Sequence, residues 1–177
     1  LPIVADIHFD YRLALECLNN GVDGLRLNPG NIGGVDHVKK VVELAKKTKT
    51  PIRIGVNGGS LEKELEADKS LTISDKMVKS AISHIKILED LDFDLIKVSL
   101  KSSDVKATVD AYRKIYELIP YPLHVGITEA GTLRKGIIKS AIGIGSLLLD
   151  GIGDTIRVSL TENPTEEVKA GLDILRI

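Results

Sequence analysis

Hydrophobic positions along the chain follow two alternating patterns. Six short runs have the apolar composition of β-strands, and the segments between them carry apolar residues at every third or fourth position. The first pattern predicts buried β-strands and the second predicts amphipathic helices. The expected strands cover residues 2–7, 22–28, 51–57, 94–101, 122–128 and 154–160. The expected helices cover residues 11–19, 35–47, 75–91, 104–119, 134–149 and 165–175.

Several residues predict where these helices begin and end. Gly21 is placed to stop the first helix, and Ser74 is placed as the N-cap of the third. Ser103 or Asp104 would cap the fourth, and Pro164 would open the last. The charged run at 62–69 is typical of a solvated loop or helix face.

Alternation of strands and helices predicts an α/β fold with parallel strands and crossover helices. A closed eight-stranded (β/α)8 barrel of the TIM type takes about 250 residues. The 177 residues here carry about six of its eight units. We expect either an open or six-unit variant or part of a longer barrel, and a strand at the very start favours the second. No linker is visible, so residues 1–177 are expected to form one domain.

Four of the expected strands share an apolar–cation–apolar pattern. The cations are Arg26, Arg53, Lys97 and Arg157. Arginine and lysine are rarely buried without partners, and parallel strands have both faces covered. Cations at matching strand positions therefore indicate a function rather than a solvated surface.

Other polar side chains cluster where the expected strands end, which is where parallel α/β folds place their sites. Because residues i and i+2 share a face of a strand, Asn28 lies with Arg26, Asn57 with Arg53, and Ser159 with Arg157. The same edge receives Asp6, His8, Asp10, Ser99, Lys101, Thr128 and Glu129. If these side chains converge, the pocket is cationic and suits a small, multiply anionic ligand such as a diphosphate.

Composition excludes several classes of protein. Lys+Arg number 24 and Asp+Glu 25, so the basic excess of a general nucleic-acid binder is absent. No apolar run reaches the ~18 residues of a membrane span, and the first ten residues do not resemble a signal peptide. One cysteine, Cys17, cannot by itself hold an iron–sulfur cluster or a four-cysteine zinc site. These features predict a soluble intracellular domain.

The histidines do not have the spacing of a metal site, so we expect no metal ligands in this chain. His8 follows Asp6 by two residues and is expected to contact a ligand or to make a structural hydrogen bond. His124 is expected in the core or lining the site, while His37 and His84 are expected on helix surfaces. Cys17 is expected in the core.

Several long strings in the chain resemble one known family. They are VADIHFDYR (4–12), LRLNPGNIG (25–33), PIRIGVNGGSLEK (51–63), KVSLKSSD (97–104), LHVGITEAG (123–131), KSAIGIGSLLLDGIGDTIRVSL (139–160) and VKAGLDILR (168–176). In this order they strongly resemble the 4-hydroxy-3-methylbut-2-enyl diphosphate synthase family of the non-mevalonate isoprenoid pathway. The resemblance covers nearly the whole chain.

The resemblance implies an activity and a domain plan. Members reductively open 2-C-methyl-D-erythritol 2,4-cyclodiphosphate, with loss of water, using a [4Fe–4S] cluster. They have an N-terminal eight-stranded barrel similar to dihydropteroate synthase and a C-terminal cluster domain, and they form dimers in which one chain's cluster domain closes over the partner's barrel. By this resemblance the chain holds barrel units three to eight, and the cluster ligands lie outside it. The chain alone is expected to be inactive.

The resemblance also implies residue roles. The diphosphate would be bound by Arg26, Arg53, Asn57, Lys101, Arg157 and Ser159, with Asn28 and His8 lining the same pocket. Thr128 and Glu129 would lie near the ring of the substrate, and Glu129 is the expected acid or base. Reduced flavodoxin or ferredoxin would supply electrons, and a bacterial cytoplasmic location is expected.

Two alternatives follow from the residues alone. Lys97 or Lys101 on a barrel strand could form a Schiff base, as in an aldolase acting on a phosphorylated sugar. The chain could also be a non-catalytic fragment that binds phosphate.

Overall fold

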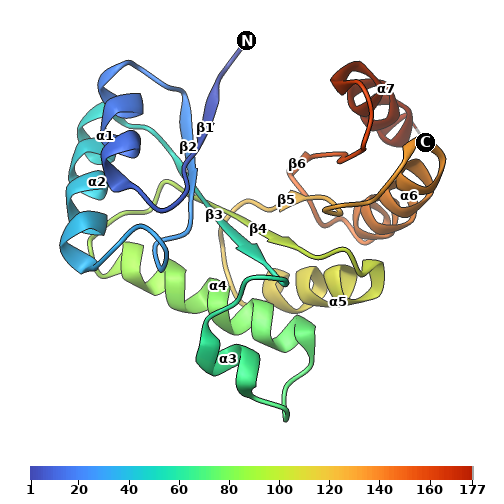
Figure 1. Ribbon diagram of the computed structural model, residues 1–177, viewed down its shortest axis with the longest axis horizontal. Coiled ribbons are helices and arrows are strands. Elements are labelled where there is room, and N and C mark those ends of the chain that lie inside the picture. The colour runs from blue at the N-terminus through green and yellow to red at the C-terminus, as the bar shows by residue number, and fades with distance from the viewer. Residues whose placement is uncertain (177) are drawn as a thin grey trace. The chain divides into compact units, whose positions relative to one another are not determined.

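The computed structural model describes residues 1–176, which form six strands and seven helices; strands and helices alternate except that two helices lie between β3 and β4 (Figure 1). The strands are β1 (Val4–Asp6), β2 (Gly24–Leu27), β3 (Ile52–Asn57), β4 (Ile96–Lys101), β5 (His124–Val125) and β6 (Thr155–Ile156). The helices are α1 (Tyr11–Asn19), α2 (Val35–Thr48), α3 (Lys63–Ala67), α4 (Ile73–Glu89), α5 (Val105–Tyr116), α6 (Leu133–Leu149) and α7 (Pro164–Leu175). None of the helices in this described part is long and apolar enough to cross a membrane.

The strands pair in parallel, as the sequence predicts. One sheet has the order β1-β2-β3-β4, and β5 and β6 form a second sheet of two strands. In the first sheet Asp6 is opposite Arg26, and Arg26 is opposite Arg53. The register therefore places one carboxylate and two guanidinium groups in a row across β1, β2 and β3.

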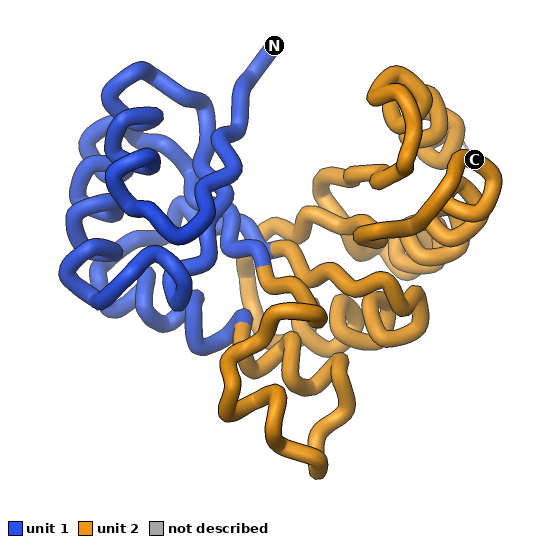
Figure 2. Tube along the Cα trace, viewed as in Figure 1, with its two compact units in different colours: residues 1–55, 81–98 blue, residues 56–80, 99–177 orange. Residues whose placement is uncertain are grey.

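The chain divides into two compact units (Figure 2). The first comprises Leu1–Gly55 and Ala81–Val98, and the second comprises Val56–Ser80 and Ser99–Ile177. Strands β3 and β4 each begin in the first unit and end in the second.

The core of the first unit lies between its strands and its helices. Leu25, Leu27, Ile52 and Ile54 on β2 and β3 are at most 1% exposed. The inner face of α2 contributes Val38, Val41, Val42 and Ala45, which are also buried. This spacing of three and four is the one from which the helix was predicted.

In the second unit a tyrosine hydroxyl joins two strands that belong to different sheets. Tyr112 of α5 is fully buried. Its hydroxyl accepts a hydrogen bond from the backbone N–H of Leu100 at 2.9 Å and donates one to the carbonyl oxygen of His124 at 2.6 Å. Leu100 lies on β4 and His124 on β5, so this side chain satisfies backbone groups that a strand ladder would otherwise satisfy.

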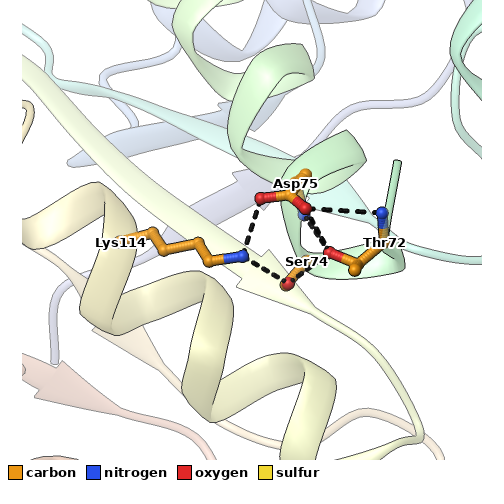
Figure 3. A network of polar contacts seen from close by, with 4 residues as sticks. All are labelled: Thr72, Ser74, Asp75 and Lys114. Atoms are coloured by element: carbon orange, nitrogen blue, oxygen red, sulfur yellow. Dashed lines mark hydrogen bonds and ion pairs between the residues drawn. The ribbon is translucent and has the colours of Figure 1, made fainter. Parts of the chain in front are cut away.

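The N-terminus of α4 is fixed by a polar network that also involves α5 (Figure 3). Lys114 Nζ lies 2.6 Å from Asp75 Oδ1 and 3.1 Å from Ser74 Oγ. The Thr72 hydroxyl donates to Asp75 Oδ2 and accepts from the Asp75 backbone N–H. Hydrogen bonds from Lys114 and then Thr72 lower the pKa of Asp75 to about 2.

At the N-terminus of α4 the structure differs from the helix cap that the sequence predicts. Ser74 was expected to precede the helix, but α4 begins at Ile73, and the hydroxyl of Thr72 bonds the backbone N–H of the first turn. Ser74 is instead a buried residue of that turn. The sequence offers a hydroxyl at both positions, so it does not distinguish them. The expected caps Asp104 and Gly21 are confirmed, the latter with a φ of 76°.

Two expected strands are much shorter in the structure. Residues 122–128 and 154–160 were predicted as strands, but only two residues of each are paired as β5 and β6. One further backbone bond, from Arg157 N–H to the carbonyl of Val125, continues this pairing. Beyond this bond, the N–H of Thr128 donates to the carbonyl oxygen of Ser102 and not to the β6 segment, so the pairing of β5 with β6 ends.

Candidate functional site

In the first unit, three side chains meet at the ends of β1 and β2. Arg26 Nη1 donates to Asp6 Oδ1 at 3.0 Å and lies 3.2 Å from His8 Nε2. His8 Nε2 lies 3.3 Å from the same carboxylate oxygen. The side chain of Arg26 is 17% exposed, whereas those of Asp6 and His8 are each 56% exposed. The arginine is thus the inner member of the cluster, and the histidine and aspartate face solvent.

A glycine on β3 makes room for this arginine. Arg26 Nη2 donates to the carbonyl oxygen of Gly55 at 3.1 Å. A Cβ on Gly55 would collide with the Arg26 guanidinium, so only glycine fits there without movement. Arg53 is half-buried and is the register partner of Arg26. Two neighbouring guanidinium groups with one carboxylate leave a net positive charge that favours an anionic ligand.

Sequence reasoning missed the role of two of these residues. Asp6 was recognised as a polar residue at a strand end but not as the partner of Arg26, and Gly55 was not singled out. The pairing could have been found from the sequence only if the register of β1 against β2 had been known.

Asn28 follows β2 and shapes the glycine-rich loop after it. Its Oδ1 accepts from the backbone N–H of Gly30 at 3.1 Å, and its carbonyl accepts from the N–H of Asn31 at 2.9 Å. His84 of α4 packs beneath this loop, because its Nε2 would lie 2.7 Å from a Cβ on Gly30.

The surface position predicted for His84 is therefore wrong. His84 is 2% exposed and lies on the same face of α4 as Ala81 and Leu88, a spacing that the sequence already shows. His37 is half-buried because its ring stacks on Tyr11, with 3.9 Å between the ring centroids. Cys17, expected in the core, is only half-buried.

Asp10 does not join the cluster at the strand ends. It caps α1 and binds Arg12, with Arg12 Nη2 at 2.7 Å from Asp10 Oδ2. These hydrogen bonds from Arg12 hold the pKa of the Asp10 carboxyl below its usual value. Its role is therefore local.

In the second unit, backbone hydrogen bonds link the segments that follow successive strands. Gly58 N–H donates to the carbonyl of Lys101 at 2.8 Å, which joins the ends of β3 and β4. The Thr128 N–H donates to the carbonyl oxygen of Ser102 at 3.3 Å, and the Thr161 N–H donates to the carbonyl oxygen of Gly131 at 3.0 Å. The predicted residues Asn57, Lys101, Thr128 and Ser159 lie along these linked segments, and each is half-buried.

Asn57 repeats the turn made by Asn28. Its Oδ1 accepts from the backbone N–H of Gly59 at 3.1 Å, and its carbonyl accepts from Ser60 at 3.0 Å. The two asparagines thus start loops of the same local design at the ends of neighbouring strands.

Glu129 has an uncommon backbone conformation. It is exposed and has a φ of 49°, in the left-handed region that non-glycine residues seldom adopt. Gly131, with a φ of 111°, continues the same turn. Residues with such backbone strain often lie at functional sites, and the acid or base role of Glu129 stays a prediction.

Arg157 is exposed and differs from Arg26 in its surroundings. It lines a groove of about 310 Å³ between the β6 segment and α7, together with Glu167 and apolar side chains of α7. Lys97 is also exposed.

No cluster of three or more histidine, cysteine, aspartate or glutamate side chains that could hold a metal ion occurs within residues 1–176.

Comparison with known proteins identifies relatives over the whole chain. Residues 1–172 match the family described as the GcpE TIM-barrel domain. The chain is 66% identical over 176 residues to a 4-hydroxy-3-methylbut-2-en-1-yl diphosphate synthase (flavodoxin) of Dehalococcoides mccartyi, covering 99% of this chain and 50% of the relative. It is 62% identical to the protein of the same name from Fusobacterium nucleatum, covering 100% of this chain and 50% of that protein. The chain therefore spans about half the length of these relatives.

Solved structures support the fold. A type I 3-dehydroquinate dehydratase from Clostridium difficile aligns with a TM-score of 0.59 at 14% identity, over 99% of this chain and 70% of that one. A dihydropteroate synthase from Xanthomonas albilineans aligns with a TM-score of 0.52 at 11% identity, over 99% of this chain and 55% of that one. At such identities the likeness concerns the fold alone. Together with the family match it confirms the predicted TIM-barrel type.

Proposed function

Because the chain belongs to the family of GcpE TIM-barrel domains, we propose that it is the substrate-binding part of a 4-hydroxy-3-methylbut-2-enyl diphosphate synthase. The observation that best supports a diphosphate ligand is the arginine pair on β2 and β3. Arg26 and Arg53 are register neighbours, and one of them is already oriented by a carboxylate and a backbone carbonyl. Preoriented guanidinium groups bind phosphoryl oxygens with little further loss of side-chain entropy.

The proposed substrate is 2-C-methyl-D-erythritol 2,4-cyclodiphosphate, which the intact enzyme would open reductively with loss of water. Its diphosphate would be bound by the cationic and polar side chains at the strand ends. These are Arg26, Arg53, Asn57, Lys101, Arg157 and Ser159, with Asn28 and His8 beside them. A rigid cyclic ligand suits such fixed groups, because little of its own freedom is lost on binding.

Glu129 and Thr128 are proposed to act at the ring of the substrate. As the proposed acid or base, Glu129 would deliver the proton that the hydroxyl group needs in order to leave as water. Its position after β5, in a strained turn that ends in Gly131, supports this role. Thr128 would help to orient the ring through its hydroxyl.

The residues described here do not fit the [4Fe–4S] cluster that the family implies. A cluster of this kind needs several cysteine ligands, and the chain has one, Cys17, a half-buried residue on α1. We therefore assign the cluster to the half of the intact enzyme that this chain does not match. The curated relatives are named as flavodoxin-dependent, and reduced flavodoxin, or alternatively ferredoxin, is the proposed electron donor.

The domain plan and assembly are part of the same proposal. Residues 1–177 would form one incomplete barrel that holds units three to eight. The intact enzyme would be a cytoplasmic bacterial homodimer. This chain alone would bind substrate only in part and would not turn it over.

A thermal melt tests the binding proposal directly. The chain is heated with the cyclodiphosphate, with inorganic pyrophosphate, and without ligand. A ligand at 100 times its dissociation constant stabilises the folded state by about 2.7 kcal/mol, so a clear rise in Tm is expected, and it should be larger for the cyclic substrate. A melt that neither ligand shifts would contradict the proposed site.

A chimera tests the activity. This chain replaces the matched half of the Dehalococcoides mccartyi synthase, and the product is assayed without oxygen with reduced flavodoxin. We expect turnover by the chimera and none by the chain alone. Loss of turnover in Glu129→Gln, with substrate binding retained, would support the proton-transfer role, whereas full activity of that variant would exclude it.

A further inference from the structure

Phe9, which lies between β1 and α1, combines a strained backbone with an exposed ring. The backbone N–H of Asp10 donates to the carbonyl oxygen of His8 at 2.7 Å, and Phe9 between them has a φ of 62°. A hydrogen bond of this span around a positive φ makes the strained and rare form of the γ-turn. At such a φ the Cβ atom crowds the backbone, so phenylalanine adopts this conformation unfavourably.

Two other residues with a left-handed backbone have a local reason for it. Lys49 ends α2, and its backbone N–H donates to carbonyl oxygens of the last helical turn. Asp92 follows α4, and its N–H donates to the carbonyl oxygen of Glu89 at 2.8 Å. Helices commonly end on a residue of this conformation. Phe9 ends no helix, so this reason does not apply to it.

The ring of Phe9 is poorly covered by the first unit. The residue is 75% exposed. Its ring contacts the ring of His8, with 5.9 Å between the centroids and a tilt of 47°. Single exposed apolar residues are common on protein surfaces, but backbone strain at such a residue is typical of functional sites. The turn therefore holds an aromatic ring in solvent at a cost in stability, which indicates a contact outside this chain.

The proposed ligand does not account for this ring. The face of an aromatic ring carries a partial negative charge, so it does not attract phosphoryl oxygens. The ring lies instead beside His8, whose imidazole belongs to the cluster with Asp6 and Arg26. In the proposed reaction, electrons reach the substrate from the half of the enzyme that this chain does not match. That unmatched half has to approach the surface beside this cluster, and the chain spans only 50% of its curated relatives.

We propose that Phe9 is an aromatic anchor for the unmatched half of the intact enzyme, and that the γ-turn holds its ring out for this contact. Aromatic side chains that fill a pocket on a partner supply much of the binding free energy at protein interfaces. Phe9 is thus a docking residue and not a ligand of the substrate. This inference rests on the proposed function and names the residue of the first unit to which the rest of the enzyme binds.

Tryptophan fluorescence tests whether the ring is covered. The chain contains no tryptophan, so Phe9→Trp adds a reporter at this position. It is measured in the chimeric synthase, after subtraction of the spectrum of the unsubstituted chimera. Lys49→Trp is the reference, because Lys49 is exposed and has the same left-handed backbone. We expect emission at shorter wavelength and weaker quenching by acrylamide for Phe9→Trp. Equal emission and quenching at the two positions would overturn the inference.

Asparagine at position 9 separates the ring from the turn. Asparagine adopts the left-handed conformation readily, so Phe9→Asn keeps the γ-turn and removes the ring, whereas Phe9→Tyr keeps the ring. In the chimera we expect turnover to fall about 10-fold or more in Phe9→Asn, the effect of removing an interface anchor. Its Tm should stay within about 3 °C of the parent. Phe9→Tyr should retain turnover within about twofold.

Lys49→Asn is the matched control for this substitution. It places the same side chain on another left-handed residue of the first unit, at the end of α2. Its turnover should stay within about twofold of the parent chimera. An equal loss of turnover in Lys49→Asn and Phe9→Asn would show that the effect belongs to the backbone and not to the ring.

Inorganic pyrophosphate distinguishes docking from contact with the ligand. The chimera with Phe9→Asn should bind it within about twofold of the parent. A tenfold loss of pyrophosphate affinity would place the ring on the ligand and overturn the inference, as would full turnover by Phe9→Asn. If the parent chimera binds neither pyrophosphate nor the cyclodiphosphate, the proposed function fails, and the fluorescence of Phe9→Trp still decides whether the ring is covered.

Discussion

Two arginines of the same sequence pattern, Arg26 and Arg157, have opposite surroundings. Arg26 lies on a strand with a neighbour on each side, and those neighbours supply the Asp6 carboxylate and the Gly55 carbonyl that hold it. Arg157 follows β6, whose only pairing among residues 1–176 is with β5, and its side chain is exposed. The comparison shows that a cation on a parallel strand is preoriented when strands on both sides contribute partners.

The largest expected effect concerns the β5–β6 side of this comparison. Tyr112→Phe removes the hydroxyl that serves both Leu100 and His124, which leaves two buried backbone groups without it. Each unsatisfied group costs about 1–3 kcal/mol, so we expect a loss of about 2–6 kcal/mol in the free energy of unfolding. Urea unfolding of the chain measures it.

Tyr116→Phe is the control on the same helix, since Tyr116 is 49% exposed. Its unfolding free energy should stay within about 0.5 kcal/mol of the parent. Equal losses in the two variants would show that the bridging hydroxyl does not stabilise the unit.

The next effect concerns the preoriented arginine. Gly55→Ala forces the Arg26 guanidinium away from β3. Because the guanidinium is the end of a flexible side chain, we expect a loss of about 1 kcal/mol in the free energy of unfolding, at the low end of the range for overpacking. We expect this loss together with a weaker Tm shift by pyrophosphate. Gly145→Ala, where a Cβ would meet nothing within 4 Å in the interior of α6, should instead stabilise the chain by up to about 1 kcal/mol. A parent-like response of Gly55→Ala to pyrophosphate would refute the role of Arg26 orientation.

A smaller effect should follow when Arg26 is made to resemble Arg157. Asp6→Asn removes the ionic partner of Arg26. Because the Asp6 side chain is 56% exposed, we expect a loss of only about 0.5–1 kcal/mol in the free energy of unfolding. The loss should shrink at high salt. Arg157→Gln should leave the free energy of unfolding unchanged within experimental error. Equal losses of unfolding free energy in Asp6→Asn and Arg157→Gln would show that the surroundings hold the two arginines equally.

The smallest effect is the pH dependence of the ion pair between Asp75 and Lys114. Their side chains are 35% and 44% exposed, so solvent screening limits the contribution to about 0.5 kcal/mol. The folded pKa of Asp75 is about 2, below the ordinary value of 3.8. Its contribution is therefore complete above about pH 4 and is lost as the pH falls towards 2. The difference in unfolding free energy between the parent and Asp75→Asn should vanish over this window, and a constant difference would contradict it.

The sequence predicts the order of the strands and of the six longer helices well, because each of these helices carries its own hydrophobic periodicity. The short helix α3 buries no residue, so its segment is expected only as a solvated loop or helix face. The sequence predicts the ends of β5 and β6 poorly, since strand length depends on which neighbours supply hydrogen bonds. The same limit applies to the site. Arg26 and Asn28 stand out by residue type and spacing, but the contact of Arg26 with Asp6 depends on register. His84 was misplaced because polarity outweighed its position on the inner face of α4.

The hydroxyl of Tyr112 has a consequence for how the second unit opens. The backbone N–H of Leu100 donates its hydrogen bond to the Tyr112 hydroxyl. Exchange of this amide hydrogen with deuterated solvent therefore requires α5 to move away. Amides bonded within the strand ladder exchange only when strands separate. The exchange rate of the Leu100 amide therefore reports how often α5 moves away from β4, and it can be measured at this one backbone position.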